Sequence, residues 1–218
     1  MKKNMKKILI LVVALAITIG ATAQENPLTY GVKAGLNLSQ ISSGTMKAEG
    51  ESQGVDALDM KAGFFVSGHV NYSFGEFFGI QPELSYSTQG GKMSEEGSTA
   101  KYSFNYINIP VLFEVKPVTN FSLFVGPQIG LNIHKGVSMG GISISGSSFT
   151  DVLKEGGMKF NNFDIAAVVG LQYAIDGKYL ISARYNIGFT TTMDSDISGM
   201  SISGLANRVF QFGVGYQF

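Results

Sequence analysis

The feature that most constrains the fold of this chain is a strict alternation of apolar and polar residues. In the segment GFFVSGHVNYSFGEFFGIQPELSYS, residues 63–87, a large apolar side chain stands at nearly every second position. Successive side chains of a β-strand point to opposite faces, so this period of two predicts strands with one apolar and one polar face. Gly75-Glu76-Phe77 interrupts the alternation, which predicts a tight hairpin.

The same alternation recurs along the chain and predicts eight strands. They cover residues 30–38, 61–74, 78–89, 102–115, 121–133, 163–175, 179–189 and 210–218. Asp176-Gly177, between the sixth and seventh strands, is a strong signal for a two-residue hairpin turn. A phase slip at Tyr106-Ile107 is interpreted as a β-bulge.

The connections between these strands alternate in length. They are short near Gly75, Pro117 and Gly177, and long at residues 41–60, 90–101, 134–160 and 191–207. Short periplasmic turns and long extracellular loops are typical of outer-membrane barrels. The predicted fold class is therefore all-β: an eight-stranded antiparallel up-and-down transmembrane β-barrel with short periplasmic turns and long extracellular loops.

The charge on the polar face indicates which face contacts lipid, because a soluble barrel would also alternate, with its apolar face inside. On four strands the polar face comprises 27 positions, within residues 61–73, 79–89, 162–176 and 180–190, and only five of them are charged. A surface in water carries about 25–35% charged residues. We therefore expect the polar face to fill the lumen and the apolar face, with Tyr and Phe near the strand ends, to contact outer-membrane lipid.

The N-terminal segment has the three parts of a secretory signal peptide. Four lysines precede an apolar run over residues 8–19, and the small residues Ala21 and Ala23 follow. We expect residues 1–23 to be the signal peptide and residues 24–218 to form one outer-membrane barrel domain, since no linker divides them.

Composition excludes several classes of function. The chain has no Cys, which excludes thiol nucleophiles and Cys-based zinc sites. Four of its 16 basic side chains lie in residues 1–23, so 12 basic and 16 acidic side chains remain, and no nucleic-acid partner is expected. His69 and His134 are the only histidines and form no ligand-spaced pair, so no metal or other cofactor is predicted.

Parity places five ionisable side chains on the inward faces of different strands. They are Lys33, His69, Glu83, Glu114 and Arg184. An eight-stranded barrel is just wide enough for side chains to fill it. The favoured interpretation is a buried network of paired charges, and the alternative is a gated path for ions or protons.

The loops raise a catalytic hypothesis, because some eight-stranded barrels are lipid-modifying enzymes. His134 stands at the start of a loop that also contains Ser138, Ser143 and Asp151. Such residues are abundant in polar loops, and a triad needs a geometry that sequence does not show. No catalytic residue is predicted.

Two loop segments share an Ile-Ser alternation. GISISGSS starts at Gly141 and GMSISGLA starts at Gly199. They could prolong strands beyond the membrane and let the loops pair, or they could be similar only because both loops are rich in Gly and Ser. The acidic residues of the first loop, Glu49, Glu51, Asp56 and Asp59, could bind a cation, but a solvated charge run is favoured.

Several motifs extend over nearly the whole chain: YGVKAGLNLS, GIQPELSYSTQGGK, YINIPVLFEVK, FSLFVGPQIGL and FGVGYQF. In these motifs the chain resembles the porin-like outer-membrane β-barrel proteins of Bacteroidota, the PorT-like family. The resemblance implies an outer-membrane location and insertion by the barrel-assembly machinery, with Phe218 as part of the insertion signal. It implies fold far better than activity.

The expected function is a structural or interaction role. A barrel filled by side chains would present loops 41–60 and 134–160 to an extracellular or envelope protein partner. One alternative is a narrow channel for ions or small solutes, and a second is a lipid-directed outer-membrane enzyme.

Overall fold

The computed structural model describes residues 27–48, 51–95, 98–140, 142–146, 158–191, 193–197, 200–203 and 205–218. The expected signal peptide, residues 1–23, lies outside these ranges. Almost all described residues are in β-strands. Within the described part of the chain, no helix is long and apolar enough to cross a membrane.

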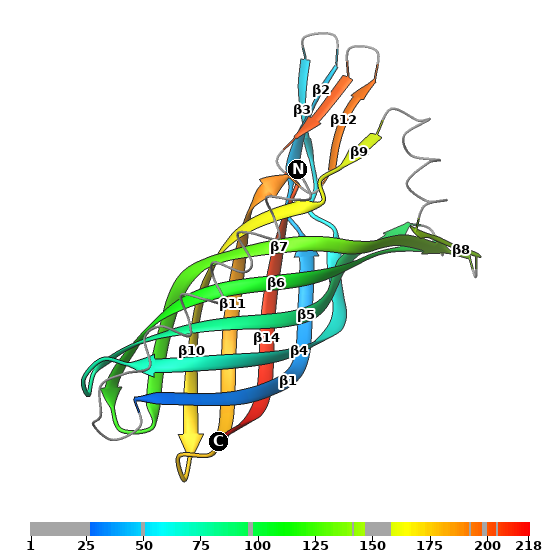
Figure 1. The fold of residues 1–218 in the computed structure, drawn as a ribbon. Coiled ribbons are helices and arrows are strands. Elements are labelled where there is room, and N and C mark those ends of the chain that lie inside the picture. The colour runs from blue at the N-terminus through cyan, green and yellow to red at the C-terminus, as the bar shows by residue number, and fades with distance from the viewer. Residues whose placement is uncertain are drawn as a thin grey trace, which may run out of the picture.

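Eight long antiparallel strands close into a barrel (Figure 1). They are β1 (Leu28–Ile41), β4 (Asp59–Ser73), β5 (Phe78–Glu95), β6 (Ser98–Val118), β7 (Phe121–Met139), β10 (Phe163–Ile175), β11 (Tyr179–Thr191) and β14 (Ala206–Gln217). Each pairs with the next of the eight along the chain, and β14 pairs with β1. The predicted eight-stranded up-and-down barrel is confirmed, and its closure pairs the backbone groups of every wall strand.

Short turns join the strands at one end of the barrel. Asp176 and Gly177 both have positive φ, 51° and 67°, as a type I′ hairpin turn requires. Asn120 in the β6–β7 turn and Gly75 in the β4–β5 turn also have positive φ. This end is the periplasmic one, because outer-membrane barrels place their short turns there.

At the extracellular end, the segments predicted as loops are largely strands. β5 continues to Glu95 and β6 begins at Ser98, so the expected loop at residues 90–101 is the tip of a long hairpin. β8 (Ile142–Ser145) pairs with the end of β7. We call this extension, residues 88–95, 98–105, 134–139 and 142–145, the β8 arm.

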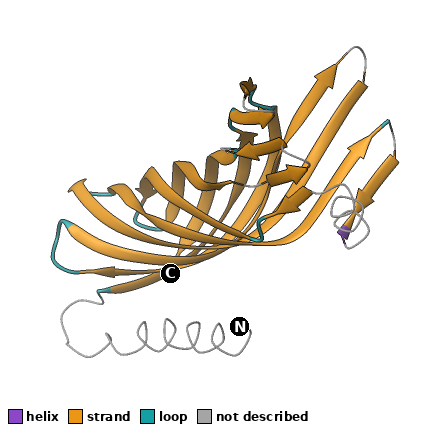
Figure 2. Ribbon diagram, turned by 90° about the horizontal axis from the view of Figure 1, so that it is seen from above, coloured by secondary structure: helices purple, strands orange, loops and turns teal. Residues whose placement is uncertain are grey.

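A separate five-stranded sheet also stands at this end. It contains β2 (Gly44–Ala48), β3 (Glu51–Val55), β9 (Met158–Phe160), β12 (Met193–Ile197) and β13 (Met200–Ser203), in the order β3-β2-β13-β12-β9. This sheet and the β8 arm leave the barrel in different directions (Figures 1 and 2).

Both Ile-Ser segments form strands, but they do not pair with each other. The first contains β8, which pairs with β7, and the second contains β13, which pairs with β2 and β12. The loops therefore pair through β2 and β13, which join the first long connection to the last.

The predicted bulge is in the neighbouring strand. The β6–β7 register does shift between Asn105 and Tyr106, but the extra residue is Ile133 of β7. β6 keeps its parity, since Phe104, Tyr106 and Asn108 are all buried. The prediction of a bulge at Tyr106-Ile107 was thus wrong about the strand that contains it. The apparent phase slip arises because Tyr106 is an aromatic residue that points inward.

The two faces of the wall have the predicted sidedness. On β1, Val32 is 50% and Leu36 65% exposed on the outer surface, whereas Lys33 and Asn37 point inward and are 1% and 0% exposed. The other wall strands follow the same rule, with apolar side chains outside and mostly polar ones inside. Tyr179, Tyr216, Phe218 and Tyr30 contact one another at the periplasmic rim, as expected of an aromatic girdle.

Candidate functional site

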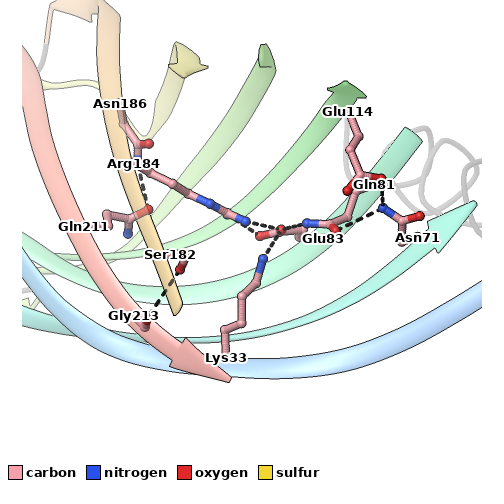
Figure 3. A network of polar contacts seen from close by, with 10 residues as sticks. All are labelled: Lys33, Asn71, Gln81, Glu83, Glu114, Ser182, Arg184, Asn186, Gln211 and Gly213. Carbon is pink, nitrogen blue, oxygen red and sulfur yellow. Dashed lines mark hydrogen bonds and ion pairs between the residues drawn. The ribbon is translucent and has the colours of Figure 1, made fainter. Parts of the chain in front are cut away.

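The middle of the lumen holds a carboxylate between two cations (Figure 3). Lys33 Nζ lies 2.7 Å from Glu83 Oε1, and Arg184 donates to both oxygens of Glu83 at 2.6 Å. The side chains of Lys33, Glu83 and Arg184 are 0%, 1% and 5% exposed. They come from β1, β5 and β11, so the ion pairs link three strands across the barrel interior.

Amide side chains connect this cluster to a second carboxylate near the periplasmic end. Gln81 donates to Glu83 Oε1 at 2.6 Å, and Asn71 donates to Gln81 at 3.2 Å and to Glu114 Oε2 at 2.6 Å (Figure 3). Lys116, which is partly exposed, lies 3.4 Å from Glu114 Oε2. The network therefore contains three cations, Lys33, Arg184 and Lys116, and two carboxylates, Glu83 and Glu114. Its net charge is +1.

His69 lies next to this network without joining it. Its side chain is buried, and neither ring nitrogen has a hydrogen-bond partner among the described residues. Its ring occupies the space beside Gly31, where an added Cβ would lie 2.7 Å from His69 Cε1. Of the five residues placed inward by parity, all five are buried and four belong to one polar network.

Above the ion pairs, toward the extracellular end, amide and hydroxyl side chains cross-link the wall. Gln211 donates to Asn37 at 2.9 Å, Asn37 donates to Ser87 at 2.9 Å, and Asn186 donates to Gln211 at 3.1 Å. These residues were not among those predicted from sequence, although their inward parity is the same signal that identified the charged residues.

An apolar cluster fills the extracellular mouth of the lumen. It consists of Ile41, Phe104, Tyr106 and Leu205, with Leu58 packed against it. Leu58 is held there because its N–H donates to the carbonyl of Ile41 at 3.0 Å. This cluster was not predicted, because three of its members lie at strand ends or in connections, where alternation gives no orientation.

A polar vestibule opens at the periplasmic end. It has a volume of about 610 Å³ and lies between the short turns and the Glu114 part of the network. Its polar lining includes Asn71, Glu114, Lys116, Ser122 and Gln172. The residues that line the vestibule do not include Lys33, Glu83 or Arg184, so the vestibule ends below this ion cluster.

The candidate catalytic residues are not assembled. His134 and Ser138 are four residues apart on β7, about 13 Å along a strand. Ser138 instead contacts Ser143, with 2.7 Å between their hydroxyl oxygens. Asp151 lies outside the described residues.

The acidic first loop shows no assembled cation site. Glu49 lies outside the described residues, and Glu51, Asp56 and Asp59 are exposed. In the described part of the chain, no group of three or more His, Cys, Asp or Glu side chains could hold a metal ion.

The β8 arm has two unlike faces. On one face, side chains of three strands form an exposed apolar patch that includes Met93, Met139, Ile142 and Ile144. Ile142 is 70% and Met139 58% exposed. The opposite face is polar and is continuous with the lipid-facing outside of the barrel wall. From sequence, extension of the strands here was one of two interpretations of the Ile-Ser segments, and the exposed patch was not predicted.

Phe218 lies at the periplasmic rim. Its N–H donates to the carbonyl of Tyr30 at 2.8 Å, and its exposed ring contacts Tyr216 and Tyr30. This position makes the residue accessible at the end of the closing strand β14. Its expected role as an insertion signal stays a prediction.

A closed barrel with an apolar outside and a polar, side-chain-filled inside is a transmembrane β-barrel of the outer-membrane class. The family model described as "Outer membrane protein beta-barrel domain" matches residues 22–194. The chain belongs to this family and is an outer-membrane protein. Among curated protein sequences, none matches this chain significantly.

Solved outer-membrane barrels are similar to the chain at low sequence identity. The attachment invasion locus protein Ail of Yersinia pestis is 17% identical, with 87% of this chain and 98% of Ail covered and a TM-score of 0.43. OprG from Pseudomonas aeruginosa is 14% identical, with 87% and 95% covered and a TM-score of 0.46. The outer membrane protease OmpT from Escherichia coli is 10% identical, with 91% and 100% covered and a TM-score of 0.44.

Proposed function

We propose that this barrel is a non-enzymatic anchor that presents the β8 arm to a protein partner outside the cell. The observation that carries the proposal is the exposed apolar patch of Met93, Met139, Ile142 and Ile144 beyond the lipid-facing belt. Contiguous apolar surface of this kind is rare on proteins in water unless a partner covers it.

The edge of the β8 arm supports the same proposal. β8 is the last strand of its sheet, so its outer edge pairs with no other strand among the described residues. Its sequence, Ile-Ser-Ile-Ser, contains no charged residue and no Pro. Charged residues and Pro are two of the features that protect the edges of sheets from pairing. A partner strand can therefore add to this edge and place apolar side chains against the patch.

The lumen gives less support to a channel. The inward side chains at successive levels of β1, Lys33, Asn37 and Ser39, are at most 1% exposed. A narrow channel for ions or small solutes would need the Glu83 ion pairs to separate. A lipid-directed enzyme would need a catalytic set that the residues around His134 do not form in the described structure.

Within the outer-membrane barrel family, we propose that the chain belongs to the porin-like, PorT-like proteins of Bacteroidota. This proposal rests on the sequence motifs alone.

The test is a comparison of proteins recovered with the barrel from intact cells after surface cross-linking. We expect a partner protein that is recovered with wild type and lost with the double variant Met139→Ser/Ile142→Ser. Ser52→Ala is the matched control, because Ser52 is an exposed residue of β3, in the separate five-stranded sheet at the same end of the barrel. Recovery of the same proteins with all three chains, each shown to be folded by its heat-dependent gel mobility, would disprove the proposal.

A further inference from the structure

The polar face of the β8 arm carries a row of residues in register across five strands. Asp59 of β4 is opposite Lys92 of β5, and Lys92 is opposite Lys101 of β6. Lys101 is opposite Ser138 of β7, which is opposite Ser143 of β8. Directly opposed residues of antiparallel strands share a face, so these five side chains lie side by side.

The rest of this face is rich in hydrogen-bond donors. Besides the row, it contains Thr88, Ser94, Thr99, Ser103, Asn105, His134 and Ser145. Within the described residues of β5 to β8, the face has no carboxylate. It therefore presents two ammonium groups among hydroxyl and amide groups, which is a suitable lining for an anion with several oxygens.

The two lysines are in an unfavourable arrangement unless an anion joins them. Like charges directly opposite each other on one face of a sheet are destabilising. Asp59 is opposite Lys92 on its other side and offsets one of the two positive charges. The net charge of the row is therefore +1. It lies closer to Lys101, because Asp59 is next to Lys92.

The row stands just above the lipid-facing belt. On the same outer face, Tyr86 and Ile107 are opposite each other, and the first polar pair above them is Thr88 and Asn105. Lys92 is four residues beyond Thr88, about 13 Å along the strand and about 10 Å along the membrane normal for a strand tilted by about 40°. This height corresponds to the headgroup region of the outer leaflet.

From this juxtaposition we infer that the face centred on Lys92, Lys101, Ser138 and Ser143 binds the phosphate of an outer-leaflet lipid headgroup. The acyl chains of the same lipid lie against the apolar wall below, which joins the charged row and the lipid-facing surface into one binding site. The ammonium groups supply charge and the serine hydroxyls donate hydrogen bonds to the remaining phosphate oxygens. This site is on the opposite face of the arm from the patch proposed to bind a protein.

Native mass spectrometry of the detergent-refolded full chain, titrated with lipid A carrying two, one or no phosphates, tests the inference. We expect affinity to fall as phosphates are removed. Lys92→Gln/Lys101→Gln is expected to weaken binding of the bisphosphorylated lipid by roughly 30-fold, because each basic group near an anionic lipid contributes about a factor of five. Asp59→Asn is expected to strengthen binding, since it removes the opposing carboxylate.

Lys47→Gln/Lys178→Gln is the matched control, because both lysines are exposed and lie away from this face. The control should bind as wild type does. Equal affinity for the phosphate-free lipid, or equal losses in the two double variants, would overturn the inference. Competition by inorganic phosphate at the concentrations at which lipid A binds would also overturn it, since the site would then recognise free phosphate rather than a lipid.

Discussion

At the scale of single residues, Glu83 determines the charge balance of the lumen. It is the only anion in contact with Lys33 and Arg184 among the described residues, and all three side chains are at most 5% exposed. Moving charges out of water is costly, and the cost is recovered only when opposite charges meet with good geometry. Phe124 adds a smaller contact, with its ring centroid 5.7 Å from the Arg184 guanidinium carbon.

Glu83→Gln should therefore destabilise the barrel strongly. The change leaves two buried cations without their counter-charge, and the expected loss in the free energy of unfolding is about 3–5 kcal/mol. Urea titration followed by heat-dependent gel mobility measures it. Glu76→Gln, which alters an exposed carboxylate in the β4–β5 turn, should have almost no effect. If both variants unfold at the same urea concentration as wild type, the ion cluster does not stabilise the barrel.

The residue-level predictions from sequence were limited to orientation. Parity assigned Lys33, His69, Glu83, Glu114 and Arg184 to the inward faces of their strands, and all five are buried in the structure. Parity does not give the relative heights of strands on opposite sides of a barrel. It therefore could not show that Arg184 reaches Glu83 across 101 residues of chain, or that His69 stays outside the hydrogen-bonded network.

At the scale of elements, the closing seam between β1 and β14 depends on close backbone approach. Gly35 is opposite Gly213 of β14 and Phe65 of β4, and the buried Phe65 ring lies beside Gly213, where an added Cβ would be 2.7 Å from Phe65 Cζ. A Cβ at Gly35 would overlap the carbonyl oxygen of Phe212 and lie 2.6 Å from Gly213 Cα. These are backbone atoms, which cannot yield by a simple side-chain rotation.

Gly35→Ala is accordingly expected to destabilise the barrel by about 1–3 kcal/mol, the usual cost of overpacking. Gly68→Ala is the matched control, because a Cβ at Gly68 of β4 would meet no atom within 4 Å. Both variants would be compared with wild type by the midpoint of urea unfolding. Equal midpoints for the two variants would show that the seam opens enough to accept a methyl group.

Elements outside the membrane were the least predictable part of the fold. The tip of the β5–β6 hairpin contains Ser-Glu-Glu-Gly-Ser, a composition with low strand propensity. Pairing with strands already aligned by the barrel overrides that propensity, since each added residue pair extends an existing ladder. The bulge was placed on the wrong strand because two adjacent apolar residues at Tyr106-Ile107 imitate a phase slip. The actual extra residue, Ile133, is the last residue of the strand predicted over 121–133, but it lies within the longer β7 of the structure.

At the scale of the whole molecule, three zones follow one another along the barrel axis. The periplasmic vestibule is polar and open, the middle is a set of buried ion pairs, and the extracellular mouth is closed by apolar side chains. Closure, strand count and sidedness were predictable from sequence because they depend on alternation and charge density. The zones were not, because they depend on which inward residues lie at the same height.

The arrangement of these zones predicts that the wild-type barrel does not conduct. A hydrated ion would have to displace Lys33 and Arg184 from Glu83 and then pass the apolar cluster around Phe104 and Tyr106. In planar bilayers at moderate voltage we expect no unitary current from the refolded full chain, while a large open porin in the same membrane conducts. A reproducible unitary current that is abolished by Glu83→Gln or Arg184→Gln, in variants shown to be folded, would instead identify the ion cluster as the constriction of a channel. In that case the barrel would be a selective pore, and its extracellular arms would stand at the entrance of a conducting path.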